Sequence, residues 1–285
     1  MRILAIGDFH GKFPKKFKKI IKKEKIDVVI DIGDHNPFKY RKLWFKHCYK
    51  KDIELWEAIG KEKTKQLIIK DNKLGEKVIK QINKLPAPVF LVYGNIDGKY
   101  ETDTHDPKPR KKIWKWYNQD FFTPMLKKYK NIKEFTYLYI RFKNYIFIGA
   151  YGQTFPGRVK SKNYRKSKAK LDRLFKKFQK ENKQDRVIFV SHNTPYNTKL
   201  DKLSMTAHEK VRGKHYGSKL IKRTIQKYQP ILAIAGHHHE CFGKDKIGKT
   251  IALNVGSAAE GEGIIIELKD NKKPKIKFIN PSISK

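Results

Sequence analysis

The sequence has few cysteines and no long apolar run. Cys48 and Cys241 are its only cysteines and form no C-x-x-C spacing, which excludes a disulfide framework and a cysteine-based metal motif. No apolar segment approaches the roughly 18 residues that a membrane-spanning helix needs. We therefore expect no membrane association, and a reducing, cytoplasmic location is the default expectation.

Acidic residues are also scarce. The 285 residues include 66 Lys and Arg but only 28 Asp and Glu, which gives a formal net charge of +38. A field of that sign attracts polyanions, so nucleotides, nucleic acid and anionic lipid heads are natural partners. A lysine-rich proteome or adaptation to heat would produce the same excess, with lysine on solvated helix faces. The charge alone does not choose between these interpretations or name a substrate.

Apolar residues are nevertheless sufficient for a large core, at 39% hydrophobic and 12% aromatic. Nine short apolar runs have the length of β-strands, namely residues 3–6, 28–32, 89–93, 137–142, 145–150, 187–190, 231–235, 251–255 and 263–268. Between them, lysine-rich segments with helical spacing cover residues 13–25, 43–84 (two helices), 167–183 and 216–228. This alternation predicts an α/β fold of two packed sheets flanked by helices, with a hairpin over residues 137–150.

We expect a single domain over residues 1–285, because no repeat and no linker interrupts the chain. Residues 99–131 differ in composition from the rest and predict an insertion beside the site. There, Trp114, Trp116 and Tyr117 lie among basic residues. These rings either stack nucleic-acid bases while lysines hold phosphates, or pack the insertion onto its domain.

Side chains that bind metals follow five of the apolar runs. They are Asp8 with His10, Asp34, Asn95, His192, and His237 with His239. Sites in open α/β sheets gather at the carboxyl ends of strands, so we expect these groups to converge on one edge. In extended chain, residues two apart point to the same side, which pairs Asp8 with His10 and His237 with His239. Glycine precedes four of the five segments and permits sharp turns and close backbone approach.

The ligand types indicate the kind of metal. Carboxylates, an amide and imidazoles without thiolate suit manganese, iron, zinc, cobalt or nickel better than magnesium alone, and we expect manganese. Seven candidate ligands exceed the needs of one ion, and a carboxylate such as Asp34 is the natural bridge between two. Two ions about 3.5–4 Å apart clamp a phosphoryl group and supply a bound hydroxide for in-line attack.

The ordered motifs resemble those of the calcineurin-like metallophosphoesterase family. They are Asp8-Phe9-His10-Gly11, Gly33-Asp34, Gly94-Asn95-Ile96-Asp97, Ser191-His192 and Gly236-His237-His238-His239. The resemblance implies a four-layer α/β/β/α sandwich with two mixed sheets. It also implies that Asp8, His10 and His239 hold one metal, that Asn95, His192 and His237 hold a second, and that Asp34 bridges them. Asp34, Asn95 and His192 would then be the catalytic residues.

One position departs from the family pattern. Where the family commonly has a histidine that donates a proton or contacts phosphate, this sequence has Ile96. General acid assistance is typically worth 10²–10⁴-fold, so we expect phosphodiesters or activated phosphoesters to be preferred over alkyl monoesters. Two alternatives remain, a nuclease that binds nucleic acid through its basic surface and a non-catalytic binding scaffold.

Several neighbours of the motifs have two interpretations. His35 either faces the substrate or lies behind the ligands, and Asp97 either bonds to the site from behind or only forms a turn. Asp31 is either buried and paired or exposed at an edge. Glu240 either orients a ligand histidine or lies on the surface. Strand alternation favours a packing role for His238.

Overall fold

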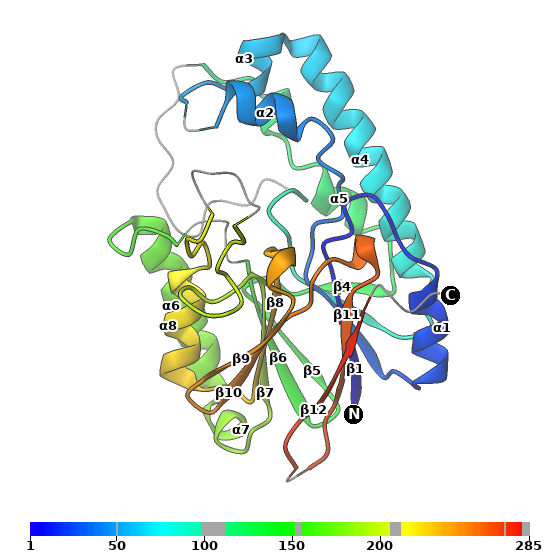
Figure 1. Ribbon diagram of the computed structural model, residues 1–285, viewed down its shortest axis with the longest axis vertical. Helices are drawn as coiled ribbons and strands as arrows, with labels where there is room; N and C mark the ends of the chain where they lie inside the picture. Colours follow the sequence, from blue (N-terminus) through cyan, green and yellow to red (C-terminus); the bar gives the residue numbers. More distant parts are fainter. Residues whose placement is uncertain (50, 98–111, 152–155, 206–211, 271, 281–285) are drawn as a thin grey trace.

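The computed structural model describes residues 1–49, 51–97, 112–151, 156–205, 212–270 and 272–280, and two β-sheets form its centre (Figure 1). The strands of the first sheet are β1 (Arg2–Ile6), β2 (Val28–Asp31), β3 (Val89–Leu91), β4 (Ile132–Glu134), β11 (Gly263–Glu267) and β12 (Lys275–Ile279). Those of the second are β5 (Tyr139–Phe142), β6 (Tyr145–Ala150), β7 (Val187–Asn193), β8 (Leu232–Gly236), β9 (Gly243–Ile247) and β10 (Thr250–Asn254).

Both sheets are mixed, with parallel strands at their centres. The first has the order β12-β11-β1-β2-β3-β4 and the second the order β5-β6-β7-β8-β10-β9. Strands β1 to β4 are parallel, as are β6, β7, β8 and β10, whereas β11, β12, β5 and β9 pair antiparallel with their neighbours. The carboxyl ends of the parallel strands therefore share one edge in each sheet, which is where a site is expected.

Helices cover the outer faces of both sheets. The described helices are α1 (Lys16–Lys23), α2 (Arg41–His47), α3 (Leu55–Ile59), α4 (Lys61–Asn83), α5 (Phe122–Leu126), α6 (Lys162–Lys177), α7 (Gln179–Lys183) and α8 (Lys219–Tyr228). Short 3-10 turns are η1 (Trp116–Asn118), η2 (His239–Cys241) and η3 (Ala258–Glu260). Figure 1 shows α1 and α4 along the first sheet and α6 and α8 along the second.

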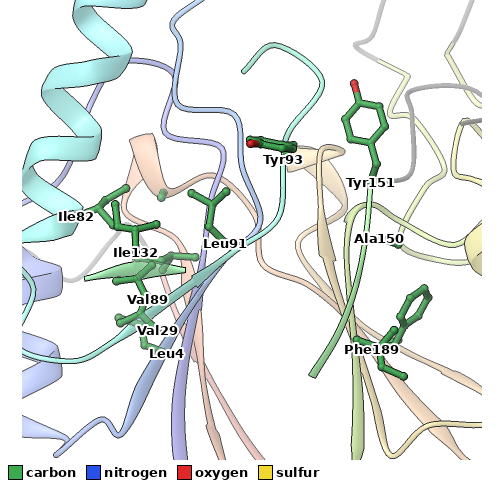
Figure 2. Packing of buried hydrophobic residues seen from close by; sticks show 14 of the residues in the cluster. Leu4, Val29, Ile82, Val89, Leu91, Tyr93, Ile132, Ala150, Tyr151 and Phe189 are labelled. Atoms are coloured by element: carbon green, nitrogen blue, oxygen red, sulfur yellow. The ribbon is translucent and has the colours of Figure 1, made fainter. Parts of the chain in front are cut away.

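Residue alternation along the strands separates two apolar layers. In β1, Ile3 and Ala5 face the core between the sheets, while Leu4 and Ile6 face the helices. Figure 2 shows Leu4 and other helix-facing strand residues near Ile82 of α4. The order helix, sheet, sheet, helix confirms the predicted four-layer α/β/β/α sandwich.

Helix α6 shows how the sequence produces an outer layer. The Ser161 Oγ accepts a hydrogen bond from the backbone N–H of Tyr164 at 3.2 Å and caps the helix. Tyr164, Leu171 and Phe175 recur at helical spacing and are buried, while the opposite face carries exposed lysine and arginine. The helix therefore begins at Lys162, earlier than the segment 167–183 that the sequence predicts.

Some elements differ from the sequence predictions. The three strands β4, β9 and β12 were not expected, and all three lie at sheet edges. Residues 43–84 were expected to form two helices, but α2, α3 and α4 fall in this region. Gly60, with a positive φ of 85°, separates α3 from α4. The predicted hairpin over residues 137–150 is confirmed by β5 and β6.

The predicted insertion is described only from residue 112 onward, and residues 98–111 lie outside the described part of the chain. Trp114 packs against Trp56 of α3, with ring centroids 6.0 Å apart, and against Trp116 at 4.9 Å. Lys61 of α4 lies over the rings of Trp56 and Trp114. These contacts favour packing over base stacking for this aromatic cluster. The single-domain organisation stays a prediction.

Across the described residues, no helix combines the length and the apolar character that a membrane crossing requires.

Candidate metal centre

The seven predicted ligands meet at the carboxyl edge of the two sheets. Asp8, Asp34 and Asn95 lie in the turns that follow β1, β2 and β3, whereas His192 belongs to the end of β7. His237 follows β8 directly, and His239 begins η2. The structure brings these residues into two adjacent groups.

The first group consists of Asp8, His10 and His239, whose potential ligand atoms lie within 4.8 Å of one another. The Nε2 atoms of His10 and His239 are 3.2 Å apart. The Asp8 Oδ1 lies 3.2 Å from the His239 Nε2 and 3.9 Å from the His10 Nε2. The other oxygen of Asp8 accepts a hydrogen bond from the backbone N–H of His237 at 2.9 Å and so connects this group to the second.

The second group consists of Asp34, His192 and His237, with Asn95 beside them. The His192 Nε2 lies 2.8 Å from the Asn95 Oδ1, 3.2 Å from the His237 Nδ1 and 3.6 Å from the Asp34 Oδ2. The His192 Nδ1 donates to the carbonyl oxygen of Ile32 at 2.8 Å. Because a carbonyl only accepts, Nδ1 is the donor in this bond, and Nε2 is the ring nitrogen that faces the group.

These contacts fit divalent metal ions better than a hydrogen-bond network. Four potential ligand atoms crowd together here, because the His192 Nε2 lies within 3.6 Å of the Asn95 Oδ1, the His237 Nδ1 and the Asp34 Oδ2. The Asp8 Oδ1 is fully buried and makes no hydrogen bond of good geometry, and its contact at 3.2 Å is the His239 Nε2, itself a candidate ligand. A buried polar atom left unsatisfied costs about 1–3 kcal/mol. A bound cation would satisfy both sets of lone pairs.

Asp34 lies between the two groups of candidate ligands. Its carboxylate interacts with His192 of the second group and with Asp8 and His10 of the first. Burial raises the pKa of Asp34, and the charge of Asp8 adds to the effect. Two carboxylates held this close in a buried site are expected to attract cations.

Charge interactions act differently on the other ligands. Burial opposes protonation of His239, but the charge of Asp8 outweighs it and raises the pKa of His239 to about 9. Burial opposes ionisation of Asp8, but His239 and the other site histidines outweigh it and hold the pKa of Asp8 well below its usual range. Burial lowers the pKa of His237 well below its ordinary value, and the neighbouring histidines add to the effect. A neutral imidazole is the form that binds metal, so His237 is ready to act as a ligand at neutral pH.

The backbone of the site corrects one sequence argument. Asp8, His10, Asp34 and His237 have positive φ angles of 55°, 44°, 61° and 70°, which lie in the left-handed region. The chain is therefore not extended there. The alternation of side chains along a strand was the wrong reason to pair Asp8 with His10 and His237 with His239. His237 and His239 in fact enter different groups.

The glycines that precede the ligands are needed mainly because they let neighbouring loops come into close contact, and less because they permit turns. A Cβ atom on Gly33 would meet the backbone nitrogen of Gly94, and one on Gly94 would meet the Asp34 Oδ1. The loops after β2 and β3 can come together only because neither glycine has a side chain. Of the glycines that precede the ligands, Gly33 is the one with a positive φ, at 94°.

The structure decides between the interpretations left open for the motif neighbours. His35 is fully buried beside Asp31 and Asp97, so it does not face a substrate. Asp97 accepts from the backbone N–H of Asp34 at 2.8 Å, which shows that it bonds to the site from behind. Asp31 is buried and paired.

The residues around η2 are also placed. His238 is buried and its Nδ1 lies 2.9 Å from the Thr194 Oγ1, in agreement with a packing role. Glu240 is exposed. Burial, Glu240 and Asp201 raise the pKa of the Cys241 thiol to about 12, so this cysteine is unreactive, as its place outside the motif spacing suggests.

One buried group near the site was not expected from the sequence. Asp201 is fully buried and accepts from the His215 Nδ1 at 2.7 Å and from the backbone N–H groups of Thr198 and Gly217, both at 2.8 Å. It organises the loop between β7 and α8. A lone aspartate in a turn-forming segment was the only sequence signal, and no spacing links it to His215.

Comparison with known proteins identifies the family. Residues 1–241 match the model of the calcineurin-like phosphoesterase family. A comparison with the curated proteins finds no match. One solved crystal structure superposes with a TM-score of 0.65 at 19% identity, over 99% of both chains.

Other solved structures are named phosphatases. A dimetal phosphatase from Danio rerio gives a TM-score of 0.55 at 11% identity, over 99% of this chain and 96% of its own. A purple acid phosphatase from seeds of yellow lupin, Lupinus luteus, gives 0.55 at 14% identity, over 100% of this chain and 52% of its own. At these identities the superpositions establish the fold alone. The family model, which includes every predicted ligand in the residues it matches, shows that the chain belongs to the calcineurin-like phosphoesterase family, whose activity is the metal-dependent hydrolysis of phosphoesters.

Proposed function

We propose that this chain uses two divalent metal ions to hydrolyse phosphodiesters or activated phosphoesters. Asp8, His10 and His239 hold the first ion, Asn95, His192 and His237 hold the second, and Asp34 bridges them. The observation that carries this proposal is the convergence of two groups of candidate ligands, each with its ligand atoms within 4.8 Å of one another. The mixed oxygen and imidazole ligands favour manganese.

Two such ions, when bound, supply charge stabilisation for the phosphoryl group and lower the pKa of a water molecule. The protein's own residues orient the site. The hydrogen bond from the His192 Nδ1 to Ile32 fixes the ring so that its Nε2 faces the group. Asp8 links the groups through the backbone N–H of His237.

Ile96 supports a preference for substrates with good leaving groups. Its backbone N–H donates to the Asp34 Oδ1 at 3.1 Å, so the main chain at this position helps to orient the bridging carboxylate. The side chain offers no proton to a leaving group. His35 does not replace the missing donor, because it is buried between carboxylates. Aryl diesters should therefore react faster than alkyl monoesters.

The test is hydrolysis of an aryl diester, an aryl monoester and an alkyl monoester with manganese, by the wild type and by His237→Ala and Asn95→Ala. Losing one ligand should remove charge stabilisation and reduce turnover by at least about 10²-fold. Asp172→Ala, which removes as many heavy atoms as Asn95→Ala but lies on the outer helix α6, should keep wild-type turnover. Unchanged turnover in both ligand variants would exclude this site. Absence of hydrolysis with any divalent ion would favour the non-catalytic scaffold.

A nuclease is the second candidate, and the surface of α6 favours it. Six exposed basic residues recur there at helical spacing, namely Lys162, Arg165, Lys166, Arg173, Lys176 and Lys177. At 1.5 Å per residue they span about 22 Å, which suits successive phosphates of a strand.

The two free thiols, Cys48 and Cys241, agree with the cytoplasmic location that we expect for either function.

Salt dependence tests this second candidate. If about six phosphates are contacted, affinity for single-stranded DNA should fall about 300-fold between 50 and 200 mM salt. Arg165→Glu/Arg173→Glu should weaken binding far more than Lys19→Glu/Lys22→Glu, which makes the same charge change on exposed positions of α1. Failure to bind at low salt would eliminate the nuclease.

A further inference from the structure

A buried charged cluster lies directly behind the bridging carboxylate. It consists of Asp31, His35 and Asp97, which are 0%, 0% and 4% exposed. The His35 Nε2 lies 2.8 Å from the Asp31 Oδ2, and its Nδ1 lies 3.0 Å from the Asp97 Oδ1. One histidine thus stands between two carboxylates, an arrangement that balances charges which would otherwise be buried without a partner.

The ring of His35 is also fixed by packing. It stacks between Phe9 and Phe122, with ring centroids 5.5 Å and 5.4 Å away and interplanar angles of 17° and 28°. Phe9 belongs to the ligand turn after β1, and Phe122 belongs to α5. The histidine therefore has little freedom to rotate, and the position of Asp97 is set with it.

Asp97 in turn holds the backbone of two ligand loops. Its Oδ2 accepts from the N–H of Asp34 at 2.8 Å and from that of Gly94 at 3.0 Å. Its Oδ1 accepts from the N–H of His35 at 2.7 Å. One carboxylate thus joins the loop that carries Asp34 to the loop that carries Asn95.

We propose that Asp97, with His35 as its charge partner, is a positioning residue for the two-metal site. It sets the distance between the bridging Asp34 and Asn95 before any metal arrives. This inference rests on the metal-binding function proposed above. Partners of this kind behind metal ligands typically contribute 10–100-fold to metal affinity.

Asp31 provides a matched control within the same cluster. It contacts the same histidine and is equally buried, but its backbone bond is to Gly33 at 2.9 Å and it does not reach the loop of Asn95. Asp31→Asn and Asp97→Asn both remove one carboxylate from His35. Only Asp97→Asn weakens the connection between the two ligand loops, because the amide keeps one acceptor oxygen and turns an NH2 donor toward the remaining backbone N–H groups.

The experiment measures manganese affinity by calorimetry, together with kcat, KM and thermal stability, for the wild type and both variants. We expect both variants to lose stability. We expect Asp97→Asn to lose at least about tenfold in manganese affinity and in kcat, with KM little changed, while Asp31→Asn stays within about threefold of the wild type. Equal losses of metal affinity in the two variants would show a role in fold stability alone and would overturn the inference.

A second variant keeps the test decisive if Asp97→Asn does not fold. Asp97→Glu retains the charge beside His35 but moves the oxygens by one methylene away from the backbone N–H groups. It should fold and still lose at least about tenfold in manganese affinity. Wild-type affinity in this variant would contradict the inference. A wild-type protein that binds no manganese would instead contradict the proposed function itself.

Discussion

The two ligand groups differ in how firmly the protein holds them. In the second group, Asp34 and His192 are buried, at 2% and 0% exposure, and both are tied to the backbone of other loops. In the first group, the side chains of His10 and His239 are 29% and 32% exposed. Asn95 and His237 of the second group are also partly exposed, and Asp8 of the first group is buried. The second group therefore has two buried ligands, Asp34 and His192, and the first has one, so the first group has more freedom.

This difference indicates an order of metal binding. Ligands that are already fixed lose less conformational entropy when an ion binds, so affinity is gained without new contacts. We expect the Asn95, His192 and His237 position, with Asp34, to bind its metal first. The more exposed position should fill later and exchange more easily with solvent.

The largest effect should come from removing one ligand of each group. His192→Ala should reduce turnover by about 10³-fold, because several kcal/mol of charge stabilisation are lost. His10→Ala should lose activity at low manganese but regain much of it when excess manganese is added. Steady-state assays over a manganese series measure both effects. Recovery of His192→Ala to the same degree would remove the distinction between the groups.

The next largest effect concerns substrate preference, which we expect to depend on the side chain at position 96 beside Asp34. Ile96→His places an imidazole at the position where the family commonly has its donor, while the backbone bond to Asp34 is retained. General acid assistance should raise the rate on alkyl monoesters by about 10²-fold relative to aryl diesters. The ratio of kcat/KM for the two substrates measures the change. An unchanged ratio would mean that Ile96 does not limit the substrate range.

A smaller effect is expected in the affinities themselves. Calorimetric titration of the metal-free protein with manganese should give two classes of site, whose Kd values differ by at least about tenfold. His10→Ala should raise the Kd of the weaker class further and leave the tighter class unchanged. Two equal classes in the wild type would contradict the inference from burial.

The smallest effect is on thermal stability. An ion present at 100 times its Kd stabilises the folded state by about 2.7 kcal/mol, which corresponds to a rise of several degrees in Tm for a chain of this size. Manganese should raise the Tm of His10→Ala nearly as much as that of the wild type, and that of His192→Ala much less. Differential scanning fluorimetry measures the rise in Tm that manganese causes in each protein, with calcium as the control ion.

The sequence predicted the central strands because they are buried on both faces. Runs such as residues 28–32 consist almost entirely of apolar residues, and parallel strands between two layers require that composition. The strands β9 and β12 contain Gly-Lys-Asp-Lys-Ile and Lys-Ile-Lys-Phe-Ile, and both lie at a sheet edge with one side exposed. An edge strand needs no apolar run, so a search for such runs does not find it.

The ligand set could be predicted because each ligand lies at the carboxyl end of a buried strand or within four residues of it. The buried cluster behind it could not. His35 lies beside Asp31 and Asp97, and the second of these is brought close only by the pairing of β2 with β3. The left-handed φ angles of the ligand residues are equally invisible to a strand-alternation argument, since they depend on the contacts that close the loops.

The most direct test is a crystal structure of the manganese-soaked protein with anomalous data collected at the manganese absorption edge. The account predicts two anomalous peaks about 3.5–4 Å apart, one against Asp8, His10 and His239 and one against Asn95, His192 and His237, with Asp34 between them. A single peak, or peaks that do not contact these residues, would contradict the two-metal site.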